Sequence, residues 1–202
     1  MNIISAFPTP IGTFEFENSK SLNEGLCEFL YGVRDEDISS GNPQRSMNGP
    51  NGYHTKEDIM TRDNYFIKEL HKLISGVLLD YYPQITNNQM GPNSRLVSWG
   101  MIYGPGAHSR IHCHPGVDLS LSYYCKTPDD MKGEEGSFEY IDPRHAARWD
   151  RNFDFSPGRI YPKEGGGAIF PSWLDHYVNP HYCDGDRICI ATNIFIDKLN
   201  QY

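Results

Sequence analysis

Residues 186–196 read DRICIATNIFI, and their period of two decides the fold class. Successive side chains of a β-strand face opposite sides of the sheet. One face of this strand is expected to pack beneath apolar helices, because it carries Ile188, Ile190, Ile194 and Ile196. The other face carries Arg187 and Asn193. A buried arginine needs a planar partner with two oxygens, so this face is predicted to look into a ligand pocket.

Five earlier segments also have the character of strands and are separated by loops rich in Gly, Pro and Asp. They read SRLVSWGMIY (94–103), DLSLSYYC (118–125), SFEYI (137–141), GGAIF (166–170) and DHYVNP (175–180). Strands that follow helices predict an α+β fold. We expect a double-stranded β-helix, of the jelly-roll or cupin-like kind, with the N-terminal helices packed on one sheet. One domain is predicted over residues 1–202.

Two helices are predicted before these strands. The first begins after Asn18 or Ser19 and has apolar residues at helical spacing as far as Val33. The second begins at about Thr61 and ends before Pro83.

Two further stretches lack a regular pattern. Residues 35–58 are rich in turn formers and are expected to form an irregular surface excursion. Residues 142–166 make a long connection that is expected to act as a lid or substrate-binding element.

Charge and composition exclude several classes of function. The 202 residues contain 18 Lys and Arg against 26 Asp and Glu, a formal net charge of −8, without a basic run. Binding to nucleic acid or to an anionic membrane needs the opposite sign. No segment approaches the roughly 18 apolar residues of a membrane span, and MNIISAFPTP lacks the features of a secretory signal. The five cysteines form no CxxC pair. We therefore expect a soluble, cytosolic protein.

The histidines suggest a metal site. His112 and His114 are one residue apart in the motif HCHP, so in an extended segment both imidazoles point to one side. His176 follows His114 by 62 residues in another predicted strand. Two ligands on one strand and a third on a distant strand form a facial three-ligand metal site in β-barrels. The alternative is that these are ordinary surface or core histidines.

The other five histidines lack paired spacing. His108 lies in a GPGAHS turn and is expected to face solvent or to support a ligand. Surface positions are expected for the remaining four, which are His54, His71, His145 and His181.

Six motifs carry a resemblance to a known family. They are FPTPI (7–11), HCHP (112–115), SYY (122–124), DPR (142–144), FPSWLDHYVNP (170–180) and RICIATN (187–193). Tyr103 opens a YGPG turn nine residues before His112, and Arg187 follows His176 by eleven residues. This pattern resembles the prolyl-hydroxylase-like branch of the 2-oxoglutarate, Fe(II)-dependent oxygenases. It is most similar to a family of small oxygenases of this kind from bacteria and cyanophages.

The resemblance implies the cofactors and the main site residues. His112 falls at the first Fe(II) position and His176 at the distal position. Arg187 falls where the family binds the far carboxylate of 2-oxoglutarate, and Tyr103 is placed to hydrogen-bond the same carboxylate. The implied partners are dioxygen and a small-molecule or side-chain substrate that is oxidised.

The resemblance also suggests a set of supporting residues. Tyr124 falls where related enzymes have a second tyrosine for the cosubstrate, and Ser120 shares its strand face. Asn193 lies on the Arg187 face and is expected to brace the cosubstrate or a ligand histidine. If the protein is encoded by a phage, the expected location is the host cytoplasm. A homodimer is a mild expectation, because jelly-roll edge strands often pair.

One position departs from the family pattern. Most of the superfamily has Asp or Glu two residues after the first histidine, whereas this chain has His114. Three neutral imidazoles leave the full charge of the metal uncompensated, which weakens metal binding and changes the affinity of the site for anionic cosubstrates. Asp118 is the nearest carboxylate and is an alternative ligand if the HPGVD turn folds back. We favour His112, His114 and His176.

Two other functions compete with a 2-oxoglutarate oxygenase. A cupin-like dioxygenase with three histidines would bind its substrate directly and use no keto acid. A non-catalytic binding module would keep the barrel alone, and the histidine at position 114 favours this alternative. Retention of Tyr103, all three histidines and Arg187 argues against decay of the site.

Overall fold

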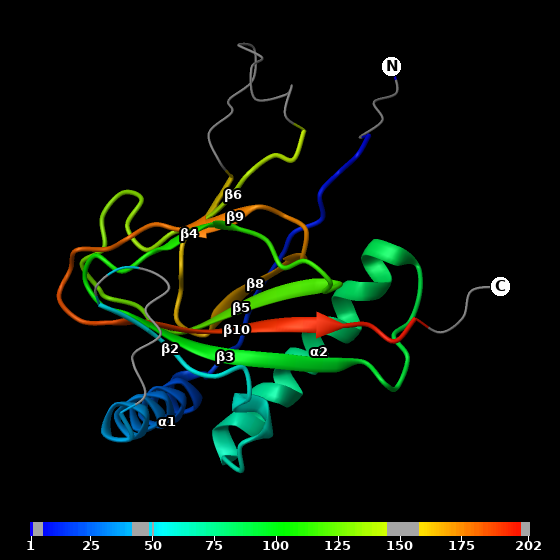
Figure 1. The fold of residues 1–202 in the computed structure, drawn as a ribbon. Coiled ribbons are helices and arrows are strands. Elements are labelled where there is room, and N and C mark those ends of the chain that lie inside the picture. The colour runs from blue at the N-terminus through cyan, green and yellow to red at the C-terminus, as the bar shows by residue number, and fades with distance from the viewer. Residues whose placement is uncertain (2–5, 42–48, 50, 145–157, 199–202) are drawn as a thin grey trace.

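The computed structural model describes residues 1, 6–41, 49, 51–144 and 158–198. Two helices lie beneath a large sheet, and a smaller sheet lies above it (Figure 1). The helices are α1 (Lys20–Ser39) and α2 (Tyr65–Thr86), with a short 3-10 turn at Ile59–Thr61. None of the described helices is long and apolar enough to cross a bilayer.

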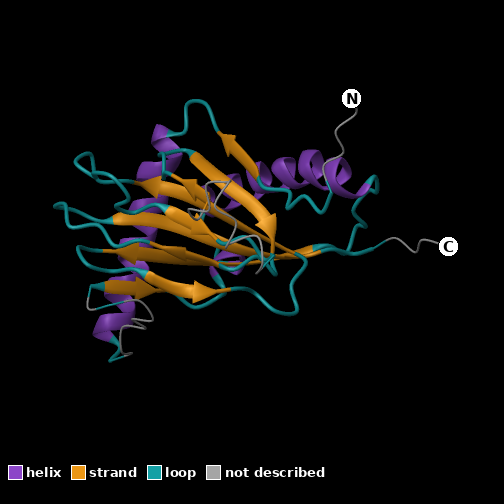
Figure 2. Ribbon diagram, turned by 90° about the horizontal axis from the view of Figure 1, so that it is seen from above, coloured by secondary structure: helices purple, strands orange, loops and turns teal. Residues whose placement is uncertain are grey.

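The large sheet has six antiparallel strands in the order β1-β8-β5-β10-β3-β2. Their bounds are β1 Gly12–Glu15, β8 Gly166–Pro171, β5 Leu119–Lys126, β10 Arg187–Phe195, β3 Arg95–Tyr103 and β2 Gly52–His54. The small sheet has the order β4-β9-β6-β7. Its bounds are β4 Ser109–His112, β9 His176–Val178, β6 Phe138–Tyr140 and β7 Gly158–Ile160. The view from above shows the strands stacked over the helices (Figure 2). The α+β, jelly-roll prediction is confirmed.

The main core lies between the large sheet and the two helices. The isoleucine face of β10 packs there with Leu30 of α1 and Ile74 of α2, all of them buried. Burying one such side chain contributes about 1.5–3 kcal/mol. Gly100 of β3 lets α1 approach, because a Cβ at this position would lie 2.2 Å from Leu30 Cδ2. The predicted parity of β10 is therefore correct.

Several element predictions were wrong in detail. Helix α1 continues to Ser39. Strand β2 lies inside the predicted surface excursion at residues 35–58, and the 3-10 turn follows directly after it. Helix α2 runs through Pro83, which has no N–H to donate to the carbonyl of Leu79. Leu79 is 64% exposed, so its carbonyl can be hydrated instead. Strands β4 and β7 were not predicted as separate elements. Residues 145–157, most of the predicted lid and the position of His145, lie outside the described residues.

Candidate metal centre

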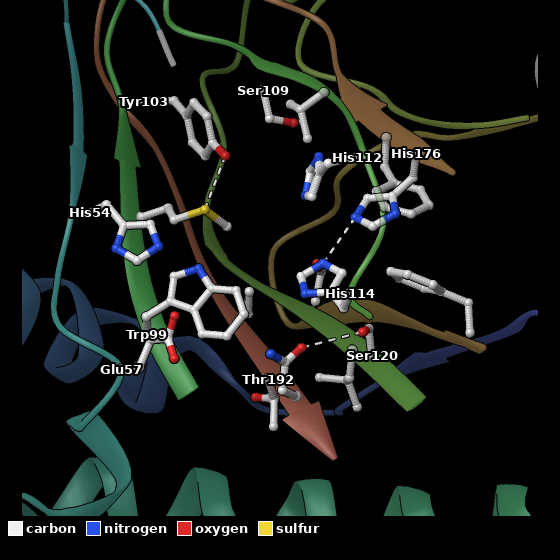
Figure 3. Close-up of a pocket in the computed structure, with 18 of the residues that line it drawn as sticks. His54, Glu57, Trp99, Tyr103, Ser109, His112, His114, Ser120, His176 and Thr192 are labelled. Atoms are coloured by element: carbon white, nitrogen blue, oxygen red, sulfur yellow. Dashed lines mark hydrogen bonds between the residues drawn. The ribbon is translucent and has the colours of Figure 1, made fainter. Parts of the chain in front are cut away.

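Three histidine side chains converge between the two sheets. His112 ends β4 and pairs directly with His176, the first residue of β9. One ring nitrogen of each of His112, His114 and His176 lies within 4.8 Å of the others. The Nε2 atoms of His114 and His176 are 3.3 Å apart (Figure 3). Rings that turn their nitrogens toward one point fit a cation with nitrogen ligands.

Backbone carbonyls orient two of these rings. The Nδ1 of His112 lies 2.7 Å from the carbonyl oxygen of Arg110. The Nδ1 of His176 lies 2.8 Å from the carbonyl oxygen of Leu174. A neutral imidazole that donates its Nδ1–H to a carbonyl carries its lone pair on Nε2, as a metal ligand requires. The third ring, His114, hydrogen-bonds to the side chain of Asn193.

Burial keeps two of the rings, His114 and His176, neutral. Desolvation, followed by the nearby charge of His112, lowers the pKa of His176 to about 3. The same causes lower the pKa of His114 to about 4. Phe138 and Phe170 contribute to this dry environment, with ring centroids 5.2 and 4.9 Å from that of His176. Both imidazoles are therefore unprotonated at neutral pH, and each can offer a nitrogen lone pair to a metal.

An aromatic stack supports His114 from the β2–β3 side. The Trp99 ring lies 5.8 Å from that of His114 at an interplanar angle of 28°. The His54 ring lies 5.6 Å from that of Trp99 at 21° (Figure 3). His54 was predicted at the surface, but it is half-buried and lines the site because β2 pairs with β3. The sequence near His54 has no periodic signal that would reveal this long-range pairing.

The histidines open into a cavity of about 370 Å³. Its walls combine aromatic and aliphatic side chains such as Phe138, Phe170 and Val178 with the hydroxyls of Ser120 and Ser122. This volume and mixture are typical of a small-molecule site. Ser120 is buried and donates to Asn193 Oδ1 at 3.4 Å, so the two predicted supporting residues lie together.

Arg187 is buried behind this cavity. It is 1% exposed, and no ion pair to it is found within residues 51–144 and 158–198. Its Nη1 donates to Cys189 Sγ at 3.3 Å, while its Nε has no partner in the same residues. A guanidinium keeps its charge in proteins, so this burial is costly until an anion reaches it.

Two tyrosine rings flank the guanidinium of Arg187. Its guanidinium carbon lies 5.2 Å from the ring centroid of Tyr103 and 5.0 Å from that of Tyr124. Tyr103 also donates a hydrogen bond to the sulfur of Met101 at 3.0 Å. Tyr103 and Met101 line the cavity, whereas Arg187 does not. Burial raises the pKa of Tyr124 to about 12 against the opposing charge of Arg187, so this phenol keeps its proton for donation.

The remaining candidates lie apart from the histidine cluster. Asp118 accepts from the N–H of Ile196 at 2.9 Å and pairs with Lys198 at 2.8 Å. His108 is half-buried and its Nδ1 lies 3.2 Å from the carbonyl oxygen of Gly106. His181 was predicted at the surface but is 0% exposed, because its Nε2 bonds to the carbonyl oxygen of Tyr103 at 2.8 Å. His71 is exposed as predicted.

A comparison with protein families finds a match within the strand region. Residues 97–193 match the family described as "Putative 2OG-Fe(II) oxygenase". The match, over just under half of the chain, indicates a 2-oxoglutarate/Fe(II)-dependent oxygenase. The matched span holds the three histidines, Arg187 and both tyrosines, so the resemblance inferred from the motifs is confirmed. No curated protein sequence matches this oxygenase.

Solved structures show the same fold at low sequence identity. A prolyl-4-hydroxylase from Pseudomonas putida has a TM-score of 0.63 and 13% identity over 93% of this chain and 92% of that one. A viral collagen prolyl hydroxylase from Paramecium Bursaria Chlorella virus-1, solved with 2-oxoglutarate, has a TM-score of 0.60 and 15% identity over 91% and 94%. HygX from Streptomyces hygroscopicus, solved with nickel and 2-oxoglutarate, has a TM-score of 0.62 and 15% identity over 96% and 85%. The oxygenase therefore has the double-stranded β-helix fold of these proteins.

Proposed function

We propose that this oxygenase holds Fe(II) through His112, His114 and His176 and uses 2-oxoglutarate and dioxygen to oxidise a small-molecule or side-chain substrate. The observation that carries the proposal is the pairing of two features around one cavity. Three imidazoles converge at one end, and a buried guanidinium with no ion pair among the described residues lies at the other. One end suits a divalent metal and the other suits a carboxylate.

The donor set supports the choice of metal. Nitrogen ligands from imidazoles suit ferrous iron, and three ligands on one side leave coordination positions for small molecules. The chain supplies the orientation through the carbonyls of Arg110 and Leu174. The Asp118 carboxylate is engaged with Lys198 and the backbone, which favours His114 as the third ligand.

The residues around Arg187 support binding of the cosubstrate. A carboxylate of 2-oxoglutarate would pair with the guanidinium and accept a hydrogen bond from the protonated Tyr124 phenol. Tyr103 is the second candidate donor, and its hydroxyl exchanges its contact with Met101 for the anion. Asn193 holds His114 and thereby contributes to the site through the metal ligand.

Ferrous iron, with 2-oxoglutarate and dioxygen, supplies the oxidising chemistry that yields succinate, carbon dioxide and an oxidised product. The chain itself excludes water with the Phe138 and Phe170 walls and keeps His114 and His176 neutral. The cytoplasmic location, the phage origin, the homodimer and the single domain remain predictions from the sequence.

Anaerobic titration of the Fe(II)-loaded protein with 2-oxoglutarate tests this function. Chelation of ferrous iron by the keto acid is expected to give a visible charge-transfer band, and admission of air is expected to release succinate. A protein that binds Fe(II) but never shows the band would support the cupin-like alternative. A protein that binds no metal would support a non-catalytic module.

A further inference from the structure

Only two charged side chains occur among the described residues that line the cavity. Glu57 and Arg110 have opposite signs, and both are exposed at the edge of the site. The other lining residues are histidines, hydroxyl-bearing residues, one amide and apolar or aromatic groups. The cavity therefore presents one anion and one cation to a bound molecule.

The two charges come from different sheets. Glu57 follows β2, the outermost strand of the large sheet, and Arg110 lies in β4, the outermost strand of the small sheet. Figure 3 shows Glu57 beside Trp99, on the His54 side of the site. Arg110 is joined to the metal cluster on the other sheet, because its carbonyl holds His112. The two charges thus flank the cavity from separate walls.

Neither charged group is neutralised by the protein. Within residues 51–144 and 158–198, the side chains of Glu57 and Arg110 form no ion pair and no hydrogen bond. Some other charged side chains among the described residues do find partners. For example, Lys163 pairs with Glu15 at 2.6 Å, and Arg159 pairs with Glu134 at 2.7 Å. Two unpaired charges of opposite sign at one cavity complement a ligand that carries both signs.

We propose that the substrate of this oxygenase is a small zwitterion of the α-amino acid class. Its carboxylate pairs with the Arg110 guanidinium and its ammonium group pairs with Glu57, so that the remainder of the molecule extends into the cavity. A residue within a peptide lacks both charges and would leave Glu57 and Arg110 uncompensated. This inference rests on the proposed function.

Calorimetry can test the charge requirement without turnover. The full chain is loaded with Mn(II) and 2-oxoglutarate under anaerobic conditions and titrated with the free protein amino acids. Each is compared with its N-acetyl and its C-amide derivative. At least one free amino acid is expected to bind, and blocking either group is expected to weaken it by about tenfold, the effect of one charge-assisted hydrogen bond.

Two variants assign each charge to its partner. Glu57→Gln is expected to weaken the free amino acid by about tenfold but to leave the N-acetyl form unchanged, because that form has no ammonium group to lose. Arg110→Met is expected to weaken the free amino acid by about tenfold but to leave the C-amide form unchanged, because that form has no carboxylate to lose. Glu28→Gln, on the exposed face of α1, is the matched control and is expected to bind like the wild type.

The outcomes separate this inference from the function on which it rests. Equal binding of free and blocked amino acids would overturn the zwitterion class and leave the oxygenase function standing. The same holds if Mn(II) and 2-oxoglutarate bind but no free amino acid does, or if Arg110→Met weakens 2-oxoglutarate instead. Failure to bind Mn(II) or 2-oxoglutarate would overturn both.

Discussion

The space between the two sheets buries polar groups at two ends, and burial affects the groups at each end differently. At one end, His114 and His176 lose their protons, with pKa values of about 4 and 3. At the other end, Arg187 is as deeply buried but has no neutral form that it can adopt in a protein. A buried imidazole can thus stay neutral and bind a cation, whereas the buried guanidinium stays positively charged and attracts an anion.

The packing around the two ends differs in the same sense. The histidine end is open to the cavity and is supported by flat rings, with Trp99 against His114 and Phe138 against His176. At the arginine end, Met101 and Tyr103 line the cavity, whereas Arg187 does not. We therefore expect the histidine end to be preformed and the arginine end to rearrange when an anion binds. Each of the following variants tests one side of the comparison.

Removal of a ligand should have the largest effect. His176→Ala is expected to weaken Mn(II) binding by more than about 100-fold, because only two imidazoles remain and outer partners alone cost 10–100-fold. Calorimetry measures the dissociation constant. His71→Ala, at an exposed position on α2, is the control, and equal affinities in the two variants would refute the three-histidine site.

Arg187→Met should separate the two ends. We expect 2-oxoglutarate to bind about 100-fold more weakly to the Mn(II)-loaded protein, since truncation of one partner of a buried charge pair costs about 2–5 kcal/mol. Metal affinity should stay unchanged. The melting temperature of the ligand-free protein should stay the same or rise, because an uncompensated buried charge is removed. A loss of metal affinity instead of 2-oxoglutarate affinity would contradict the comparison.

Trp99→Leu should loosen the metal end alone. Losing the flat contact on His114 is expected to weaken Mn(II) by about tenfold, in the range of other groups that orient a ligand. Trp99→Phe keeps a ring in the stack and should recover most of the affinity. If Leu and Phe behave alike, the stack does not orient His114.

Met101→Ala should open the arginine end. Removing the thioether that Tyr103 contacts is expected to strengthen 2-oxoglutarate binding by roughly threefold, a difference of well under 1.4 kcal/mol. Met101→Leu retains the bulk and should bind like the wild type. A weaker affinity of the Ala variant would show that Met101 contacts the cosubstrate rather than covering its site.

The pH dependence of the metal-free protein should be the smallest effect. The folded pKa values of His114 and His176 lie below the usual value of 6.5, so below this pH the unfolded chain binds more protons. Their contribution to stability is complete above pH 6.5 and is lost as the pH falls toward 4. We expect a melting temperature a few degrees lower at pH 5 than at pH 7.5. His176→Gln should reduce that difference, and an unchanged difference would contradict neutral burial.

Local sequence patterns predicted a large part of this architecture. The isoleucines of β10 follow a period of two, and such a pattern needs no knowledge of distant residues. The spacing of His112 and His114 is equally local, because it alone predicts that both imidazoles point to one side of an extended segment. The roles of His54 and His181 were missed, because each depends on a long-range contact: β2 with β3 for His54, and the Tyr103 carbonyl for His181.

Alternation along single strands and short motifs are enough to predict the face of β10 that meets the helices, the three histidines and the burial of Arg187. Long-range packing, by contrast, brings Trp99 against His114, Tyr103 and Tyr124 against Arg187, and Glu57 and Arg110 to one cavity. The physical reason is that these arrangements depend on which edges of two sheets lie together, and that is set by packing of the whole chain.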